Sequence, residues 1–428
     1  MTIDRKTFLR RLGAAGLVAA VGTPRLNAQP GETSPWPPVR RASDPAGFWR
    51  QVRAQYPIME TPVYFNCGGL GPSPRPVLDI FDVTARALQH RVDTGHFFFE
   101  QARSIAADFL GATPDEICFT RNATEGNGII ASGLDLRPGD EVIFESHAHP
   151  GGSLPWLNEA RQRGIVVKVF QPDETSAAGN LEQIVAKLTP RTKVIQVSHI
   201  TATTGLVMPV KAIAALAREK NLWFHIDGAQ SAGMIPVNLH AIDCDSYATS
   251  GHKWLGGPRE TGVLYLRAAR VAEVAPRHVG AYSSADFDFQ GQLNYTDGAR
   301  RHEYGTRSAA GVVALAEAMR FQTTIGRERI AEYGAGLSLR VQQGLAQIKG
   351  VRVLSPVAPE LRSSMTTFAI EGKNAAQMFG FLLEKHGFRC RPVTEAGLDA
   401  VRISTHVFND TESCDRVVGA VTQLSALA

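Results

Sequence analysis

The chain has 428 residues, of which 44% are hydrophobic and 20% charged, and this is the composition of an ordinary globular protein. The length exceeds what one small core needs and suits a large α/β domain followed by a smaller one. A formal net charge of +4 is small for this length and gives no reason to propose a nucleic-acid partner. No segment reaches the roughly 18 apolar residues that a membrane-spanning helix needs. The five cysteines are scattered without a CxxC spacing, so neither a zinc site nor a disulfide framework is indicated.

Residues 1–28 have the pattern of an export signal that is removed from the mature protein. A basic segment precedes a short, weakly apolar run, and a small residue, Ala28, follows. The pattern resembles a twin-arginine signal, with Lys6 in place of the second arginine and Leu26 where a cleavage site prefers a small side chain. We therefore expect a periplasmic or exported protein that uses the twin-arginine export machinery; the alternative is an amphipathic extension on a cytoplasmic protein. Residues 29–43 are rich in Pro, Gly and Ser and are expected to form a linker.

From Asp44 onwards, strands alternate with helices, which predicts a parallel or mixed sheet with crossover connections. A side-chain cap followed by proline starts a short helix at Asp44, and a first strand runs into a glycine-rich loop over residues 63–72. The further expected strands are 116–120, 141–145, 193–198, 222–227, one ending at Thr249, and 262–266. The expected helices are 76–92, 96–110, one opening at 122–127, 209–220 and 308–325. Residues 277–301 are irregular and polar and are expected to form a loop at a subunit interface.

A small second domain is expected over residues 327–428, after a large domain over residues 44–326. It opens with a long amphipathic helix and continues with a mixture of strands and helices. The expected helices are 330–348, 375–386 and one after 409–410, and the expected strands are 351–354, 365–370, 388–391 and 400–404.

A lysine, Lys253, stands between small residues and glycines just after an expected strand. A lysine held partly out of water has its ammonium form disfavoured, so its amine can act as a nucleophile and base. The obvious use is an imine with a carbonyl cofactor, pyridoxal 5'-phosphate (PLP). Asp227, at the end of the 222–227 strand, then supplies the carboxylate that keeps the ring nitrogen protonated and makes the ring an electron sink for a carbanion. The alternatives are a surface lysine and an aspartate that caps the turn after its strand.

The lysine segment, the 227–230 turn and the later 303–306 segment resemble the class V aminotransferase family, which has PLP fold type I. That family includes cysteine desulfurases, selenocysteine lyases and isopenicillin N epimerase, and the resemblance runs from about Tyr64 to the C-terminus. It implies an α/β fold with a large domain, built on a central, mostly parallel seven-stranded sheet, and a small C-terminal α+β domain. It also implies a homodimer with shared active sites.

The resemblance implies contacts for the phosphate of PLP. They are Ala123 and Thr124 at a helix start, which offers free backbone N–H groups, and Ser250 and His252 beside the lysine. Thr306 is expected to reach the phosphate of the partner subunit. The alternatives are that Thr124 and Thr306 are plain helix caps.

Two histidines one residue apart, His147 and His149, open another possibility, a metal site. The resemblance implies that His149 stacks on the pyridine ring and fixes which Cα bond breaks. An exported metal hydrolase that uses His147 and His149 is the alternative from a different class. Its further ligands are not evident in the sequence, so we assign no metal ligand and leave His147 without a role.

Relatives often carry an asparagine, bonded to the ring hydroxyl, at the place of Ala202. Alanine cannot make this bond, so Gln230, Thr203 or Thr204 must contact that oxygen instead, and the departure points away from the desulfurases. His225 lies one strand period before Asp227 and is expected to be a satisfied core histidine.

Arg402 matches the family arginine that binds the substrate carboxylate with two parallel hydrogen bonds, and Asn66 of the glycine loop is expected on the substrate side as well. A surface ion pair is the alternative for Arg402. The 392–398 loop lacks the cysteine that a desulfurase needs, and Cys390 is expected to be a packing residue. The segment around 402–409 is most similar to isopenicillin-N-epimerase-type members. We expect an enzyme that acts at the Cα of an amino acid or peptide-linked amino acid, of epimerase or transaminase type; a β-elimination lyase is the runner-up and an inactive binding protein a further alternative.

Overall fold

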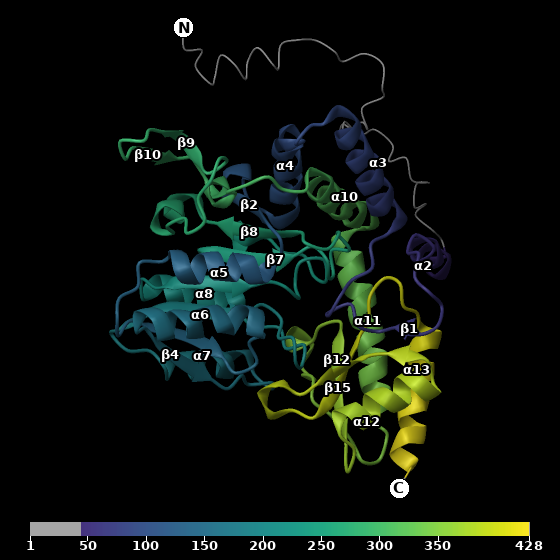
Figure 1. Cartoon of the computed structure of the whole chain (residues 1–428). Coiled ribbons are helices and arrows are strands. Elements are labelled where there is room, and N and C mark those ends of the chain that lie inside the picture. Colours follow the sequence, from purple (N-terminus) through teal and green to yellow (C-terminus); the bar gives the residue numbers. More distant parts are fainter. Residues whose placement is uncertain (1–43, 428) are drawn as a thin grey trace. The chain divides into compact units, whose positions relative to one another are not determined.

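The structure, a computed structural model, describes residues 44–427 (Figure 1). These residues belong to one compact unit. The expected export signal at 1–28 and the expected linker at 29–43 lie outside the described residues. No helix in the described part is both long and apolar enough to cross a membrane.

A seven-stranded sheet forms the centre of the larger part of the fold (Figure 1). In sheet order its strands are β2 (Ile117–Thr120), β8 (Gly262–Leu266), β7 (Ser246–Ser250), β6 (Trp223–Asp227), β5 (Thr192–Ser198), β3 (Glu141–Glu145) and β4 (Val166–Phe170). The five strands from β7 to β4 pair in parallel, whereas β8 is antiparallel to both of its neighbours. This confirms the expected mostly parallel seven-stranded sheet.

Helices cover both faces of this sheet, which is why its inner strands are buried at almost every position. Successive residues of a strand point to opposite faces. In β8, Val263 and Tyr265 join one hydrophobic cluster and Leu264 and Leu266 the other. The first cluster takes in α4 (Phe99–Leu110), α8 (Val210–Glu219) and α10 (Ala309–Ile325), and the second takes in α5 (Ala123–Gly133) and α6 (Pro150–Arg163). The remaining α-helices between residues 44 and 326 are α2 (Pro45–Arg53), α3 (Arg75–Arg91), α7 (Ala177–Val185) and α9 (Leu239–Ile242).

A four-stranded antiparallel sheet organises the C-terminal part, in the order β11-β12-β15-β14. Its strands are β11 (Val351–Val353), β12 (Met365–Ile370), β15 (Ala400–Ser404) and β14 (Arg391–Val393). The helices of this part are α11 (Arg327–Leu345), α12 (Ala375–Gly380), a π-helical turn (Phe381–Lys385) and α13 (Thr411–Ala426).

The early strand β1 (Val63–Tyr64) crosses over to this C-terminal part and pairs in parallel with β13 (Phe388–Arg389). The Ser404 N–H also donates to the Phe65 carbonyl at 2.8 Å. The glycine loop that follows β1 is therefore held against β15.

Two expectations from the sequence are wrong: the loop at 277–301 and the single strand at 388–391. Residues 277–301, expected to be a loop, contain an antiparallel hairpin of β9 (Ser284–Phe287) and β10 (Leu293–Tyr295), which the polar residues of the segment concealed. The single strand expected at 388–391 is two strands, because β13 pairs with β1 and β14 pairs with β15, with Cys390 between them.

Candidate active site

A cavity of about 250 Å³ lies where β6 and β7 end and α5 begins. The carboxyl ends of parallel strands are the usual place for ligands in such sheets. Most of the residues expected in the site line this one cavity: Ala123, Thr124, His149, Asp227, Gln230, Ser250, His252, Lys253 and Arg402. Asn66 adjoins it through Arg402, and Thr306 does not line it.

Lys253 sits in the turn after β7, under the glycine loop. The Gly71 N–H donates to the His252 carbonyl at 2.7 Å, and a Cβ on Gly71 would stand 1.8 Å from the Lys253 carbonyl oxygen. Only glycine allows the loop to lie this close. Burial lowers the pKa of Lys253 to about 8, although the nearby Asp227 carboxylate opposes the shift. The amine is therefore easier to deprotonate than that of an ordinary lysine.

Asp227 is held by two donors. Its Oδ1 accepts from the Ala229 N–H at 3.0 Å, and its Oδ2 accepts from Asn127 Nδ2 at 3.0 Å. Both contacts come from N–H groups, and together they fix the orientation of the carboxylate.

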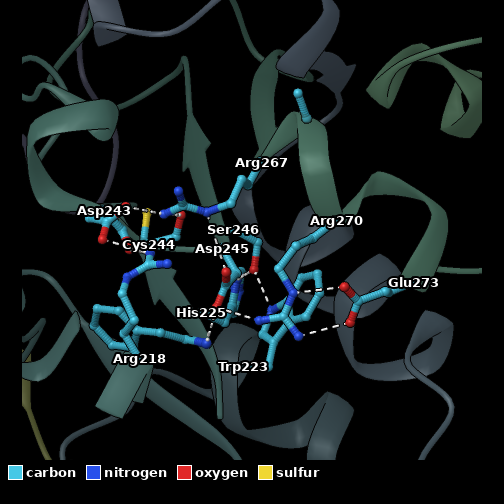
Figure 2. Close-up of polar contacts among 12 residues, drawn as sticks. Arg218, Trp223, His225, Asp243, Cys244, Asp245, Ser246, Arg267, Arg270 and Glu273 are labelled. Atoms are coloured by element: carbon cyan, nitrogen blue, oxygen red, sulfur yellow. Dashed lines mark hydrogen bonds and ion pairs between the residues drawn. The ribbon is translucent and has the colours of Figure 1, made fainter. Parts of the chain in front are cut away.

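A chain of buried hydrogen bonds runs from Asp227 into the sheet. Asn127 Nδ2 also donates to a backbone carbonyl, so the amide oxygen must accept, and it accepts from His225 Nε2 at 2.8 Å. His225 Nδ1 then accepts from the Ser246 hydroxyl at 2.8 Å, and Ser246 Oγ accepts from Trp223 Nε1 at 2.9 Å. Figure 2 shows Trp223, His225 and Ser246 together. In each link from Trp223 through Ser246, His225 and Asn127, the N–H or O–H donates to the partner that lies nearer to Asp227.

His225 is thus satisfied in the core, as expected, and burial lowers its pKa to about 3, which keeps it neutral. The sequence reasoning missed Asn127. Its position four residues after Ala123 puts both on one face of α5, and that spacing is the signal that could have found it.

His149 and His147 lie in different surroundings. His149 is the N-cap of α6, with Nδ1 accepting from the Gly151 N–H at 3.0 Å, so its remaining proton is on Nε2. Burial, with Lys253 nearby, lowers the pKa of His149. His147 Nδ1 lies 3.3 Å from Glu174 Oε1. Within residues 44–427 no three His, Cys, Asp or Glu side chains are grouped to hold a metal ion.

The start of α5 fits a phosphate group. The Ala123 N–H donates to Ser250 Oγ at 3.0 Å, which places this hydroxyl at the helix start, and His252 Nδ1 is buried without a hydrogen-bond partner among the described residues. Burial and the Lys253 charge lower the pKa of His252 to about 4, and a neutral imidazole can still donate one N–H. The N-cap of α5 is Asn122, because its Oδ1 accepts from the Glu125 N–H at 2.9 Å. The alternative that Thr124 is the cap is therefore wrong.

The three residues expected to compensate for Ala202 differ in their contacts. Gln230 lines the cavity; its Nε2 donates to the Gly68 carbonyl at 2.9 Å and its Oε1 accepts from an indole N–H. Thr204 Oγ1 donates instead to a glutamate at 2.8 Å. Thr203 Oγ1 is buried without a partner in the described part of the chain.

Arg402 is 1% exposed and ends in the cavity wall. Its Nη1 donates to the Ala202 carbonyl at 2.5 Å and its Nη2 donates to Asn66 Oδ1 at 3.1 Å. The described residues give it no ion pair with a carboxylate, so the surface ion-pair alternative is wrong, and burial lowers its pKa. A buried guanidinium without a carboxylate partner fits an incoming carboxylate.

Thr306 lines a separate cavity of about 360 Å³. The segment before it is anchored by Glu303, whose two carboxylate oxygens accept from Arg103 at 2.9 and 3.0 Å and which also accepts from the Phe119 N–H at 2.7 Å. Ser308 caps α10, so the cap alternative for Thr306 is wrong.

Arg391 also lines the lysine cavity, and the sequence reasoning gave it no role. It faces Arg402 across the β14–β15 pair. Strand pairing brought these arginines together, and no local motif signalled it.

The model of a family described as Aminotransferase class-V matches residues 81–417. An isopenicillin N epimerase from Amycolatopsis lactamdurans is 29% identical over 403 residues, which cover 89% of this chain and 99% of that protein. A probable cysteine desulfurase 2 from Mycobacterium leprae is 29% identical over 402 residues, covering 86% and 95%.

Among solved structures, a mutant of C-DES with glycine covalently linked to its PLP cofactor superimposes with a TM-score of 0.78 and 26% identity, covering 88% of this chain and 99% of that one. The complex of the cystine C–S lyase C-DES with its product cysteine persulfide superimposes with a TM-score of 0.76 and 26% identity, covering 85% of this chain and 97% of that one.

Proposed function

The chain belongs to the aminotransferase class-V family of PLP-dependent enzymes, and from that premise we propose that it breaks a bond at the Cα of an amino acid or a peptide-linked amino acid. The observation that carries the proposal is one cavity lined by Lys253, Asp227 and Arg402. An amine, an anchor for the ring nitrogen and an anchor for a carboxylate are the groups such chemistry requires.

The residues fit PLP, which when bound supplies an aldehyde for an amine and a ring that accepts the electron pair left at Cα. Lys253 would hold the aldehyde carbon and Asp227 the ring nitrogen. Ser250 and His252, with the start of α5, would hold the phosphate, since His252 Nδ1 is a buried polar atom that lacks a partner among the described residues.

The side chains around the cavity would orient the substrate and move its proton. Arg402, steadied by Asn66, would bind the α-carboxylate and so fix which Cα bond faces the ring. Lys253 Nζ would take the Cα proton, because its lowered pKa of about 8 makes it a usable base near neutral pH. His149, held by its cap bond, would flank the ring as a neutral imidazole.

Epimerase-type or transaminase-type chemistry is our first choice because the chain offers no thiol for sulfur transfer. All five cysteines are buried, none lines the cavity, and burial raises the pKa of Cys390 to about 12. A buried thiol of high pKa is a poor nucleophile. A β-elimination lyase is the second candidate, favoured by the similarity to C-DES, and it also needs no thiol on the enzyme.

Incubating the PLP-loaded enzyme with a panel of amino acids in heavy water tests the proposal. Deuterium at Cα is expected for the true substrate class; inverted product indicates an epimerase, keto acid a transaminase, and ammonia with keto acid a lyase. Lys253→Ala should keep its fold by circular dichroism and lose exchange by at least about a hundredfold, the size of a general-base contribution. Undiminished exchange in this variant would refute the mechanism.

We further propose that the enzyme is a homodimer in which Thr306 serves the partner's site. In this chain Thr306 lines a different cavity from Lys253, although its segment is firmly anchored by Glu303. A residue held rigidly away from its own site can act on the site of a symmetry-related subunit.

We also propose export of the folded enzyme, supported by the pattern of residues 1–28. Full-length protein expressed in a bacterial host should be recovered from the periplasmic fraction, and Arg5→Gln should leave it in the cytoplasm. Lys6→Arg, which completes the arginine pair, should increase export. If neither substitution changes the distribution, the extension is not a twin-arginine signal.

A further inference from the structure

Arg391 is a cation on the cavity wall that the proposed function does not use. It stands directly opposite Arg402 in the antiparallel pairing of β14 with β15. Residues directly opposite each other have Cβ atoms about 4.5–5.5 Å apart, and like charges in that position destabilise a sheet. The fold therefore keeps two guanidinium groups side by side at one cavity despite their repulsion.

The hydrogen bonds of Arg391 are incomplete. Its Nη2 donates to Glu395, which follows in a short turn and whose side chain is 33% exposed. The pair is partly buried, and its Glu395 side remains open to water, which screens the attraction. The other terminal nitrogen, Nη1, is buried and has no hydrogen-bond partner among residues 44–427. A guanidinium offers its N–H donors as a fork that matches a carboxylate, and part of this fork is unused.

The charges around the cavity also leave Arg391 without a counterpart in the substrate. When PLP is bound, Asp227 would hold its ring nitrogen and the start of α5 its phosphate, and Arg402 would bind the α-carboxylate of an amino acid. A substrate with a neutral side chain would have no anionic group to bind Arg391. A partly buried guanidinium, however, is stabilised by an anionic partner.

We propose that Arg391 binds a second carboxylate of the substrate, so that the enzyme selects amino acids or peptide-linked amino acids carrying an acidic group besides the α-carboxylate. This inference rests on the proposed function. A carboxylate is the matching anion because the Glu395 carboxylate already fits one edge of the guanidinium. Glu395 then competes with the substrate for Arg391 and weakens the binding of anions that are too short to contact this guanidinium.

Calorimetric titration of the PLP-loaded enzyme with glutarate and with its monoamide, glutaramate, tests the proposal. The two ligands have the same length and differ in one carboxylate. We expect glutarate to bind the natural enzyme at least about tenfold more tightly, the effect of one charge-assisted contact. Arg391→Gln should abolish this preference and leave glutaramate binding unchanged. Glu395→Gln should strengthen glutarate binding alone.

Arg389→Gln is the matched control, since Arg389 lies two residues earlier, is exposed and does not line the cavity. Equal binding of both ligands by the natural enzyme, or an equal loss for both in Arg391→Gln, would overturn the proposal; the second result would mean that both arginines hold one carboxylate. Because no bond at Cα breaks in this titration, its outcome is independent of the heavy-water exchange. The two experiments can therefore fail separately.

Discussion

At the scale of single residues, the candidate site buries charged side chains and leaves some of them, such as Arg402, without an oppositely charged partner among the described residues. Burial lowers the pKa of Lys253, while two N–H donors hold the carboxylate of Asp227 in place. Asn127 and His225 extend this arrangement into the sheet. One cavity thus holds an amine of lowered pKa and a carboxylate fixed by two hydrogen bonds.

The pKa of Lys253 leads to a prediction for cofactor uptake. Only the deprotonated amine attacks an aldehyde, so the rate at which the apoenzyme takes up PLP should rise with pH with a midpoint near 8. Absorbance in the violet measures this uptake, and Lys253→Ala, the control, should develop no such band. A midpoint near the ordinary lysine value of about 10.4 would contradict the prediction.

The hydrogen-bond chain behind Asp227 predicts graded effects on the cofactor. Asn127→Leu removes a donor to the carboxylate and should weaken PLP binding by about 1.5–3 kcal/mol, the value of a hydrogen bond to a charged group. His225→Phe should have a smaller effect and Ser246→Ala the smallest, because each acts on Asp227 through one more bond. Equilibrium dialysis measures the affinities. Equal effects of all three would mean that the chain merely supports the fold.

At the scale of elements, strands and turns far apart in the sequence are fastened to one another around the cavity. Gly68 is one such point, since a Cβ there would stand 2.7 Å from Arg402 Nη2. Another is the Arg103–Glu303 pair, which ties α4 and β2 to the segment that carries Thr306. These contacts fix the elements that bear the site residues.

The buried Arg103–Glu303 pair predicts a large stability effect. Glu303→Ala should lower the free energy of unfolding by about 3–5 kcal/mol, because it removes the buried carboxylate that pairs with the Arg103 guanidinium. Urea denaturation measures the loss. Asp415→Asn, which breaks the exposed pair with Arg340, is the control and should leave the midpoint unchanged. A small effect of Glu303→Ala would show that water reaches the guanidinium.

At the scale of the whole molecule, the cavity with Lys253 is lined by residues from both the seven-stranded and the four-stranded parts. Thr306 lines a different cavity. Lys253 and Asp227 come from the first part, whereas Arg402 comes from the second. A relative movement of the two sheets would therefore change the distance between the reacting amine and the carboxylate anchor.

The proposed shared site predicts complementation between two defective subunits. Thr306→Glu should repel the phosphate of the partner's cofactor, and Lys253→Ala should inactivate its own site. Random mixing of the two variants should restore about a quarter of the activity, because half of the dimers then carry one intact site. Size-exclusion chromatography checks that the hybrids are dimers. No recovery would mean that Thr306 serves its own subunit or neither.

The resemblance to the class V family implied the seven-stranded sheet, whereas the sequence by itself determined the α/β class, six of the seven strands, and Lys253 and Asp227 as a candidate pair. Each of these depends on local information: alternating strands and helices, a lysine among glycines, and an acid at the end of an apolar strand. The expectation for most of the cavity lining came from the resemblance to the class V family, and the structure brings those residues together at the ends of neighbouring strands.

Only the tertiary structure decided which distant side chains meet. Arg391 faces Arg402 through a strand register, and Asn127 reaches both Asp227 and His225 from a helix packed on the sheet. The hairpin within residues 277–301 likewise depends on pairing. Register and packing arise from contacts between segments separated by many residues. The local patterns of one sequence predict the strands and helices, but they do not show which of them pair.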